Sequence, residues 1–102
     1  HKAERHVLLV AREATINAVR HAKPSTITVV LTYSEFTLSL SVTDDGSGFD
    51  VDVAKASERF GLRGMHERVN RLNGCLKIDS SLDEGTVVTV VLENMEQWEK
   101  RL

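Results

Sequence analysis

The stretch "STITVVLTYSEFTLSLSVTDDGSGF", residues 25–49, decides the fold of this chain. Two runs within it alternate apolar with polar residues, and Ser34 and Glu35 stand between the runs. This period of two residues predicts two β-strands joined as a hairpin. The apolar residues predicted to share one face are Ile27, Val29 and Leu31 in the first strand and Leu38, Leu40 and Val42 in the second. One face of this hairpin is therefore expected to lie against other elements of the chain.

Helical segments are predicted before and after this hairpin. The stretch "RHVLLVAREATINAVRHAKP", residues 5–24, has the spacing of a helix with one wide buried face, and Pro24 ends it. Its apolar positions are Val7, Leu8, Ala11, Ala14, Ala18, Val19 and Ala22. A second helix is predicted over residues 61–74, "GLRGMHERVNRLNG", with Met65, Val69 and Leu72 inward and Gly74 as its C-terminal cap.

The remaining segments complete an α+β pattern. "CLKIDS" and "GTVVTVVLE" predict a second hairpin that turns through "SLDEG", residues 81–85. Residues 50–60 are polar and predict a loop with at most one helical turn, and residues 94–102 predict a short helix capped by Asn94. The order of helix, two strands, loop, helix and two strands predicts a two-layer α/β sandwich, with the helices packed on one face of a mixed β-sheet.

Composition limits the size and class of the protein. A chain of 102 residues with 41% apolar content can form a single domain with one core. The formal net charge of −2, with both signs mixed, gives no general attraction to nucleic acid or to an anionic membrane. The single cysteine, Cys75, excludes an internal disulfide and a thiolate metal site and fits a reducing compartment. No signal peptide or membrane-spanning stretch is recognised, and the charged start at His1 indicates a piece of a longer protein.

Three polar residues follow one edge of the first predicted helix. Glu13, Asn17 and His21 are each four residues apart, so they share a face beside apolar neighbours. An isolated pair would be a solvated stripe. A carboxylate and an amide oxygen on one face also suit Mg²⁺, which takes few protein ligands and keeps water and phosphate oxygens.

The end of the second strand carries two carboxylates and two glycines. One interpretation of Asp44, Asp45, Gly46 and Gly48 is an Asx-type turn that ends the strand. The other is a binding site, in which a carboxylate accepts a hydrogen bond from an exocyclic amine and glycines let a flat ring approach the backbone.

Two further glycine-containing stretches permit a structural or a functional reading. Gly61 and Gly64 flank a helix start, which is either a flexible helix terminus or an anion site made of free backbone N–H groups. Gly85 and Thr86 fit a hairpin turn. The sequence has no phosphate-binding loop motif, no dinucleotide-binding fingerprint and no Ser/His/Asp arrangement.

Taken together, "REATINAVRHA" (12–22), "DDGSGF" (44–49), "GLRGM" (61–65) and "EGT" (84–86) resemble the nucleotide-binding boxes of the GHKL ATPase superfamily, in the same order. That superfamily includes type II topoisomerases, heat-shock chaperones, mismatch-repair ATPases and sensor histidine kinases. The resemblance covers about residues 4–93, and residues 61–80 most resemble the catalytic domain of bacterial histidine kinases of the nitrate-sensor and membrane-fluidity-sensor type. It implies the Bergerat ATP-binding fold over a single domain, residues 1–102.

The resemblance also implies roles for individual residues. Glu13 and Asn17 would be the catalytic residues, Asn17 would hold Mg²⁺, and Asp44 would read the amino group of adenine. The other residues implied in ATP binding are Arg20 and His21 near the phosphates, Gly46 and Gly48 beside the purine, Gly61, Leu62, Arg63, Gly64 and Met65 at the lid and phosphates, and Thr86 beside Asp44. Phe49 and Phe60 are interpreted as core residues.

The resemblance implies the ATP-binding catalytic domain of a cytoplasmic two-component kinase, part of a membrane-anchored sensor. Such a domain presents the γ-phosphate of ATP to a histidine on a separate dimerisation domain of the same parent protein, and a response regulator receives the phosphate later. His66 follows the phosphate-binding glycines on another helix, so we interpret it as an exposed helix residue and not as the acceptor. The alternatives are a serine kinase of anti-sigma-factor type and a degenerate scaffold without catalysis.

Overall fold

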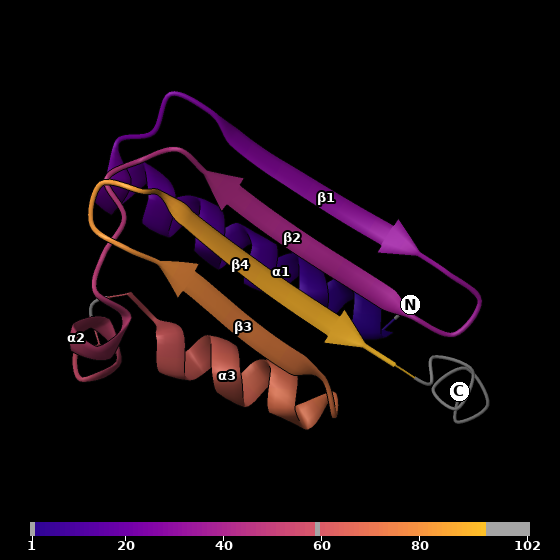
Figure 1. Cartoon of the computed structure of the whole chain (residues 1–102). Coiled ribbons are helices and arrows are strands. Elements are labelled where there is room, and N and C mark those ends of the chain that lie inside the picture. Colours follow the sequence, from indigo (N-terminus) through magenta and orange to yellow (C-terminus); the bar gives the residue numbers. More distant parts are fainter. Residues whose placement is uncertain (1, 59, 94–102) are drawn as a thin grey trace.

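The computed structural model describes residues 2–58 and 60–93, and the predicted helix over residues 94–102 lies outside this part. The elements are α1 (Lys2–Asn17), the π-helical turn η1 (Ala18–Ala22), β1 (Ile27–Tyr33), β2 (Leu38–Asp44), α2 (Val51–Lys55), α3 (Leu62–Arg71), β3 (Cys75–Ser80) and β4 (Thr86–Leu92). The helices lie on one face of the sheet, and α1 runs behind its central strands (Figure 1). The predicted two-layer α+β architecture and both hairpins are confirmed.

The strand order of the sheet is β1-β2-β4-β3, and every pairing between the described strands is antiparallel. The predicted mixed sheet is therefore wrong for these strands. β3 runs in the same direction as β2, so the two would form a parallel pair if they were neighbours. β4 lies between them and is antiparallel to both, which removes that parallel pair.

The inward face of the first hairpin forms much of the core. Leu38, Leu40 and Val42 of β2 are at most 2% exposed, as the alternation predicts. Val29 pairs with Val42 but is 48% exposed, because β1 is an edge strand and α1 packs over β2 instead.

The Glu4 carboxylate, through a hydrogen bond to the phenol, raises the pKa of Tyr33. The first turn of α1 thus lies beside the last residue of β1.

The first helix begins earlier than the predicted stretch of residues 5–24, and its end is less regular than the pattern predicts. The alanines and Val7 predicted to face inward are buried, whereas Leu8 and Val19 are 47% and 63% exposed, so their predicted burial is wrong. After Asn17 the backbone widens into the π-helical turn η1, a distortion that is frequent at functional sites. The chain leaves this turn through Lys23, which has a left-handed φ of 45°. No described helix has both the length and the apolar character needed to cross a bilayer.

Short-range hydrogen bonds define the start of α2 and the end of α3. The Asp50 carboxylate accepts a hydrogen bond from the Val53 N–H at 3.1 Å and caps α2, so the helical turn allowed for in the predicted loop over residues 50–60 is this five-residue helix. At the end of α3, the N–H groups of Asn73 and Gly74 donate to the carbonyls of Asn70 and Val69. This is a Schellman motif in which Asn73, with φ 55°, takes the left-handed position that was predicted for Gly74.

Candidate nucleotide-binding site

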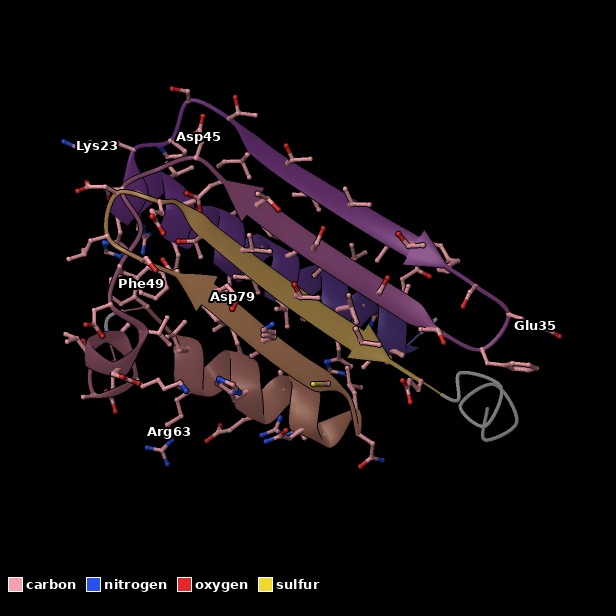
Figure 2. All side chains as sticks on the ribbon, viewed as in Figure 1. Lys23, Glu35, Asp45, Phe49, Arg63 and Asp79 are labelled. Atoms are coloured by element: carbon pink, nitrogen blue, oxygen red, sulfur yellow. The ribbon has the colours of Figure 1, made fainter. Side chains whose placement is uncertain are left out.

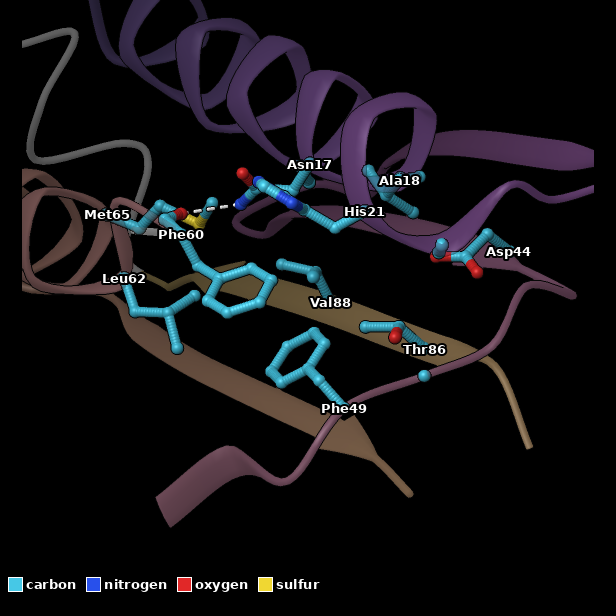
Figure 3. Close-up of a pocket in the computed structure, with 14 residues that line it drawn as sticks. Asn17, Ala18, His21, Asp44, Phe49, Phe60, Leu62, Met65, Thr86 and Val88 are labelled. Atoms are coloured by element: carbon cyan, nitrogen blue, oxygen red, sulfur yellow. Dashed lines mark hydrogen bonds between the residues drawn. The ribbon is translucent and has the colours of Figure 1, made fainter. Parts of the chain in front are cut away.

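A cavity of about 40 Å³ opens where η1, the start of α3, the end of β2 and the start of β4 meet (Figure 3). The sequence-predicted residues that line it are Asn17, His21, Asp44, Gly48, Leu62, Met65 and Thr86. Residues that the sequence analysis did not assign to a site line it as well, and they are Ala14, Ala18, Ala22, Val42, Phe49, Phe60 and Val88. The cavity is thus a mostly apolar slot with a polar group at each end, an arrangement typical of small-molecule sites.

One end of this cavity is built by the register of the sheet. Asp44 pairs with Thr86 across β2 and β4, so both side chains point to the helical face. Asp44 is 8% exposed and Thr86 is 7% exposed, and they are the buried polar residues of the described part of the chain. The Asp44 Oδ1 atom accepts a hydrogen bond from the Gly46 N–H at 2.8 Å. A carboxylate has more acceptor positions than this one contact uses, so Asp44 can also accept from a group in the cavity.

The adjacent carboxylate has a different task. Asp45 is exposed, and its Oδ1 atom accepts hydrogen bonds from the N–H groups of Ser25 and Thr26 at 2.8 and 2.9 Å. Figure 2 shows Asp45 beside Lys23 at the end of the sheet that carries the site. Asp44 therefore fits both interpretations of this strand end, because it accepts from the N–H two residues on, as in an Asx-type turn, and also lines the cavity. Asp45 instead joins the strand end to the segment that leads into β1.

The glycines after Asp45 are required by the packing of the protein against itself. A Cβ atom at Gly46 would lie 2.5 Å from the Cβ and carbonyl oxygen of Ala22. Gly48 has a φ of 64°, and a Cβ there would overlap the carbonyl oxygen of Ser81. The Ser47 N–H between them donates to the Ala22 carbonyl at 2.9 Å. These contacts fix the loop to η1, so the closest backbone approach at these glycines is to the protein's own chain.

The other end of the cavity is closed by aromatic rings. Phe49 and Phe60 stack with centroids 4.8 Å apart, and the His21 ring lies 4.7 Å from Phe60. Both phenylalanines pack against the core as predicted, but they also wall the cavity, so the interpretation as core residues was incomplete. Their positions directly beside "GSG" and "GLRGM" were the signal that could have placed them in the site.

Asn17 links α1 to the segment that precedes α3. Its Nδ2 atom donates to the Phe60 carbonyl at 2.6 Å, the interaction drawn in Figure 3. The Oδ1 atom of the same amide has no proton to donate and remains an acceptor. Among the described residues, no three His, Cys, Asp or Glu side chains gather closely enough to hold a metal ion. An Asn oxygen with a carboxylate one turn away fits Mg²⁺, which binds through one or two protein ligands and substrate phosphates.

Glu13 lies outside the closed cavity, in a larger hollow of about 470 Å³ between α1 and α3. The hollow is also lined by Gly61, Gly64 and Met65, so Met65 borders both spaces. Gly61 has a φ of 64°, and the Glu13 Oε1 atom lies 3.0 Å from the place of a Cβ at this position. The structure therefore brings the predicted catalytic carboxylate to the N-terminus of α3.

Arg20 and Arg63 are exposed, and neither lines the closed cavity or the larger hollow. The Arg63 Nε atom donates to Glu67 Oε1 at 3.2 Å across one helical turn. Both side chains are largely in water, where such a pair contributes little to stability. Arg63 lines another hollow of about 360 Å³ at the start of α3, together with Gly61 and Gly64.

Known proteins with similar sequences include sensor kinases. The chain is 38% identical to the sensor histidine kinase LiaS of Bacillus subtilis over 87 residues, which are 85% of this chain and 24% of LiaS. It is 39% identical to the signal transduction histidine-protein kinase/phosphatase DegS of the same organism over 83 residues, which are 79% of this chain and 22% of DegS. The chain thus spans about a quarter of the length of these relatives.

Solved structures with a similar fold include a histidine kinase domain. The histidine kinase domain of the blue-light-activated kinase EL346 from Erythrobacter litoralis superposes with a TM-score of 0.74 at 22% identity, over 90% of this chain and 45% of that one. Because the two sequences are only 22% identical, this similarity establishes a shared fold alone. Residues 2–95 also match the family described as histidine kinase-, DNA gyrase B- and HSP90-like ATPases. The chain therefore belongs to this family of ATPases.

Proposed function

We propose that residues 1–102 form the ATP-binding catalytic domain of a two-component sensor histidine kinase. The observation that carries this proposal is the buried Asp44 at one end of an apolar slot whose other end is Asn17. Relatives that are 36–39% identical are sensor proteins and histidine kinases by name. Because the chain spans only a quarter of the first of them, the activity of the whole protein is part of the proposal.

Adenine would enter the slot with its amino group toward Asp44. The side chains of Val42, Val88 and Leu62 provide apolar walls for a flat ring, and Thr86 lies beside the carboxylate. A carboxylate only accepts hydrogen bonds when it is ionised, so it favours a donor such as an exocyclic amine. Gly48 contributes to the same wall, and Gly46 holds the loop that carries it in place.

The phosphates would lie toward the N-terminus of α3. The first N–H groups of a helix have no partner within the helix and attract anions. Here they belong to Leu62, Arg63 and Gly64, which follow the left-handed Gly61. His21 lines the slot, and Arg20 and Arg63 are exposed and long enough to turn toward bound phosphates, so we keep them in the proposed site.

Mg²⁺ bound with ATP would neutralise charge on the β- and γ-phosphates. Asn17 would hold it through its Oδ1 atom, which the hydrogen bond to Phe60 leaves available. Glu13, one turn earlier on the same helix and facing the larger hollow, would orient a water molecule or the metal. The protein groups would thus position the γ-phosphate and form no covalent bond to it.

Nucleotide binding requires the aromatic wall to move. A cavity of about 40 Å³ has room for only a few water molecules, at roughly 10–15 Å³ each. The Phe60 ring, stacked on Phe49, closes the slot, and the Phe60 carbonyl accepts the hydrogen bond from the Asn17 side-chain amide. Opening would separate Phe60 from Phe49 and free the Asn17 side chain for the metal and phosphates, as lid opening does in other enzymes.

The implied partners are a dimerisation domain of the same parent protein, which carries the acceptor histidine, and a response regulator. The proposed location is the cytoplasmic part of a membrane-anchored sensor.

A serine kinase of anti-sigma-factor type and a scaffold without catalysis are the rival functions. The family to which the chain belongs and its histidine kinase relatives favour the kinase over both.

Calorimetric titration of ATP with and without Mg²⁺, with GTP as control, tests the proposed site. Mg²⁺-dependent ATP binding with rejection of GTP is the expected result, and failure of both the domain and the longer parent protein to bind ATP would overturn the proposal. Incubation of the domain with ATP and the parent's dimerisation domain then tests the reaction. Acid-labile phosphate on that domain indicates phosphohistidine, and acid-stable phosphate would point to the serine kinase.

A further inference from the structure

Ser80, the last residue of β3, was not recognised in the sequence and lies next to the proposed adenine site. It pairs with Thr86 across β3 and β4, and Thr86 pairs with Asp44 across β4 and β2. The three side chains therefore form one row on the helical face of the sheet. Ser80 does not line the cavity, so any effect on a ligand must pass through Thr86 or another neighbour.

The Ser80 hydroxyl has three polar contacts. The Phe49 N–H donates to its Oγ atom at 2.9 Å, the Gly85 carbonyl oxygen lies 3.1 Å away, and the Thr86 Oγ1 atom lies 2.8 Å away. Ser80 is partly buried, and Thr86 and Gly85 are buried. Unpaired polar atoms are costly in such surroundings, so all three contacts are expected to be used.

Counting protons gives each contact a direction. A serine hydroxyl has one proton and two lone pairs. The Gly85 carbonyl can only accept, so the Ser80 proton points to it, and the Phe49 N–H occupies one lone pair. The second lone pair is left for Thr86, whose hydroxyl proton therefore points to Ser80 and away from the cavity.

We propose that Ser80 is a positioning residue that fixes the Thr86 hydroxyl as a hydrogen-bond acceptor and so makes the site select a 6-aminopurine over a 6-oxopurine. With its proton engaged, Thr86 presents only lone pairs to the cavity, beside the acceptor-only carboxylate of Asp44. A ligand amine satisfies both groups, whereas a carbonyl oxygen would face two acceptors. This inference rests on the proposed function, because it requires that adenine lie against Asp44.

The test is a comparison of ATP with inosine triphosphate, which carries a 6-oxo group in place of the amine. The wild-type chain is expected to bind ATP more tightly. Ser80→Ala frees the Thr86 hydroxyl to rotate and donate, so ATP should bind about three- to tenfold more weakly, while inosine triphosphate binds equally well or better. Ser80→Thr keeps a hydroxyl at this position and should restore the preference. Calorimetry with Mg²⁺ measures the affinity of each of the three proteins for both nucleotides.

A double-mutant cycle tests whether Ser80 acts through Thr86. Thr86→Val alone should lose much of the preference for ATP, and adding Ser80→Ala to it should change the preference no further. Ser41→Ala is a matched control, because Ser41 is a partly buried serine on the opposite face of the same sheet. It should leave both affinities unchanged.

The outcomes separate this inference from the proposed function. If neither the wild-type chain nor the longer parent protein binds either nucleotide, the site itself is refuted and the inference with it. If it binds ATP but Ser80→Ala lowers both affinities by the same factor, Ser80 is merely structural and the inference is wrong while the ATP site stands. Should Ser80→Ala fail to fold, Ser80→Cys fills similar space with a weak donor, and an unchanged preference in that variant would also overturn the inference.

Discussion

At the scale of single residues, neighbours in sequence have separate tasks. Asp44 and Asp45 are consecutive, but their side chains leave the strand end in opposite directions because the side-chain period of a strand is two. Asp44 is buried against the cavity, whereas Asp45 accepts from the backbone of the turn that leads into β1. Asn17 likewise combines a structural contact with Phe60 and the proposed metal ligation.

Asp44→Ala should weaken ATP binding with the fold retained. A hydrogen bond to a charged group contributes about 1.5–3 kcal/mol, which corresponds to an affinity loss of about 10- to 150-fold. Titration calorimetry measures it. Asp45→Ala is the matched control, since it removes the hydrogen bonds to Ser25 and Thr26 and should lower thermal stability more than affinity. Equal ATP affinity in wild type and Asp44→Ala would refute the adenine contact.

Asn17→Asp should disturb Mg²⁺-dependent ATP binding more than binding without metal. The change adds a charge at the proposed ligand and removes the Nδ2 donor that holds the Phe60 carbonyl. Parallel titrations with Mg²⁺ and with a chelator give the two affinities, and Asn70→Asp, on the exposed side of α3, controls for the added charge. An identical loss under both conditions would argue against a metal role for Asn17.

At the scale of elements, the termini of helices and strands determine the site. The π-helical turn directs His21 into the cavity, the left-handed Gly61 begins α3, and a Schellman motif ends it. The predicted loop over residues 50–60 contains a capped helix whose Ala54 is buried in the core. Packing therefore fixes the first part of this segment, and in the proposed function Phe60 is the part that moves to admit a nucleotide.

Phe60→Ala should accelerate ATP association. The substitution removes the stack with Phe49 that closes the slot, and such aromatic pairs contribute about 0.5–1.5 kcal/mol. If opening limits the rate, association should become about two- to twelvefold faster in stopped-flow experiments. Phe36→Ala, in the exposed turn at the far end of the sheet, should leave the rate unchanged. Slower association in the Phe60 variant would contradict the closed-slot interpretation.

Gly64 lies within α3 and Gly74 lies just after it. Substitution by alanine should change the stability of the fold in opposite directions at these two positions. At Gly74 a Cβ would overlap the side chain of Leu92, so Gly74→Ala should destabilise the fold by about 1–3 kcal/mol. At Gly64, inside α3, a Cβ meets open space, and alanine should stabilise the fold by about 0.5–1 kcal/mol through helix propensity. Urea denaturation measures both free energies of unfolding. A destabilised Gly64→Ala variant would show that this helix start is strained in a way the contacts do not reveal.

At the scale of the whole molecule, ligand binding and folding are linked. ATP at 100 times its dissociation constant should stabilise the domain by about 2.7 kcal/mol, provided that it binds only the folded state. For a domain of about 100 residues, this raises the midpoint of thermal unfolding by roughly 10 °C or more. Thermal scans with ATP and Mg²⁺, with GTP as control, measure the shift. A scaffold without a nucleotide site would show no shift with either nucleotide.

The sequence by itself determined the elements of this protein and the family boxes that mark its site. The alternation in residues 27–42 and the helical spacing of residues 7–22 are local patterns, which indicate the type of each element without any knowledge of its partners. The boxes predicted part of the lining of the slot, including Asn17, Asp44 and Thr86.

Only the tertiary structure decided which of these residues meet. Neighbouring strands are chosen by long-range packing, and the insertion of β4 between β2 and β3 sets Thr86 between Asp44 and Ser80. The aromatic wall is non-local in the same way, because Phe60 reaches Asn17 from 43 residues away. Periodicity fixes which face a side chain takes, but it carries no information about the partner on that face, and it is the partner that determines what Ser80 and Phe60 do.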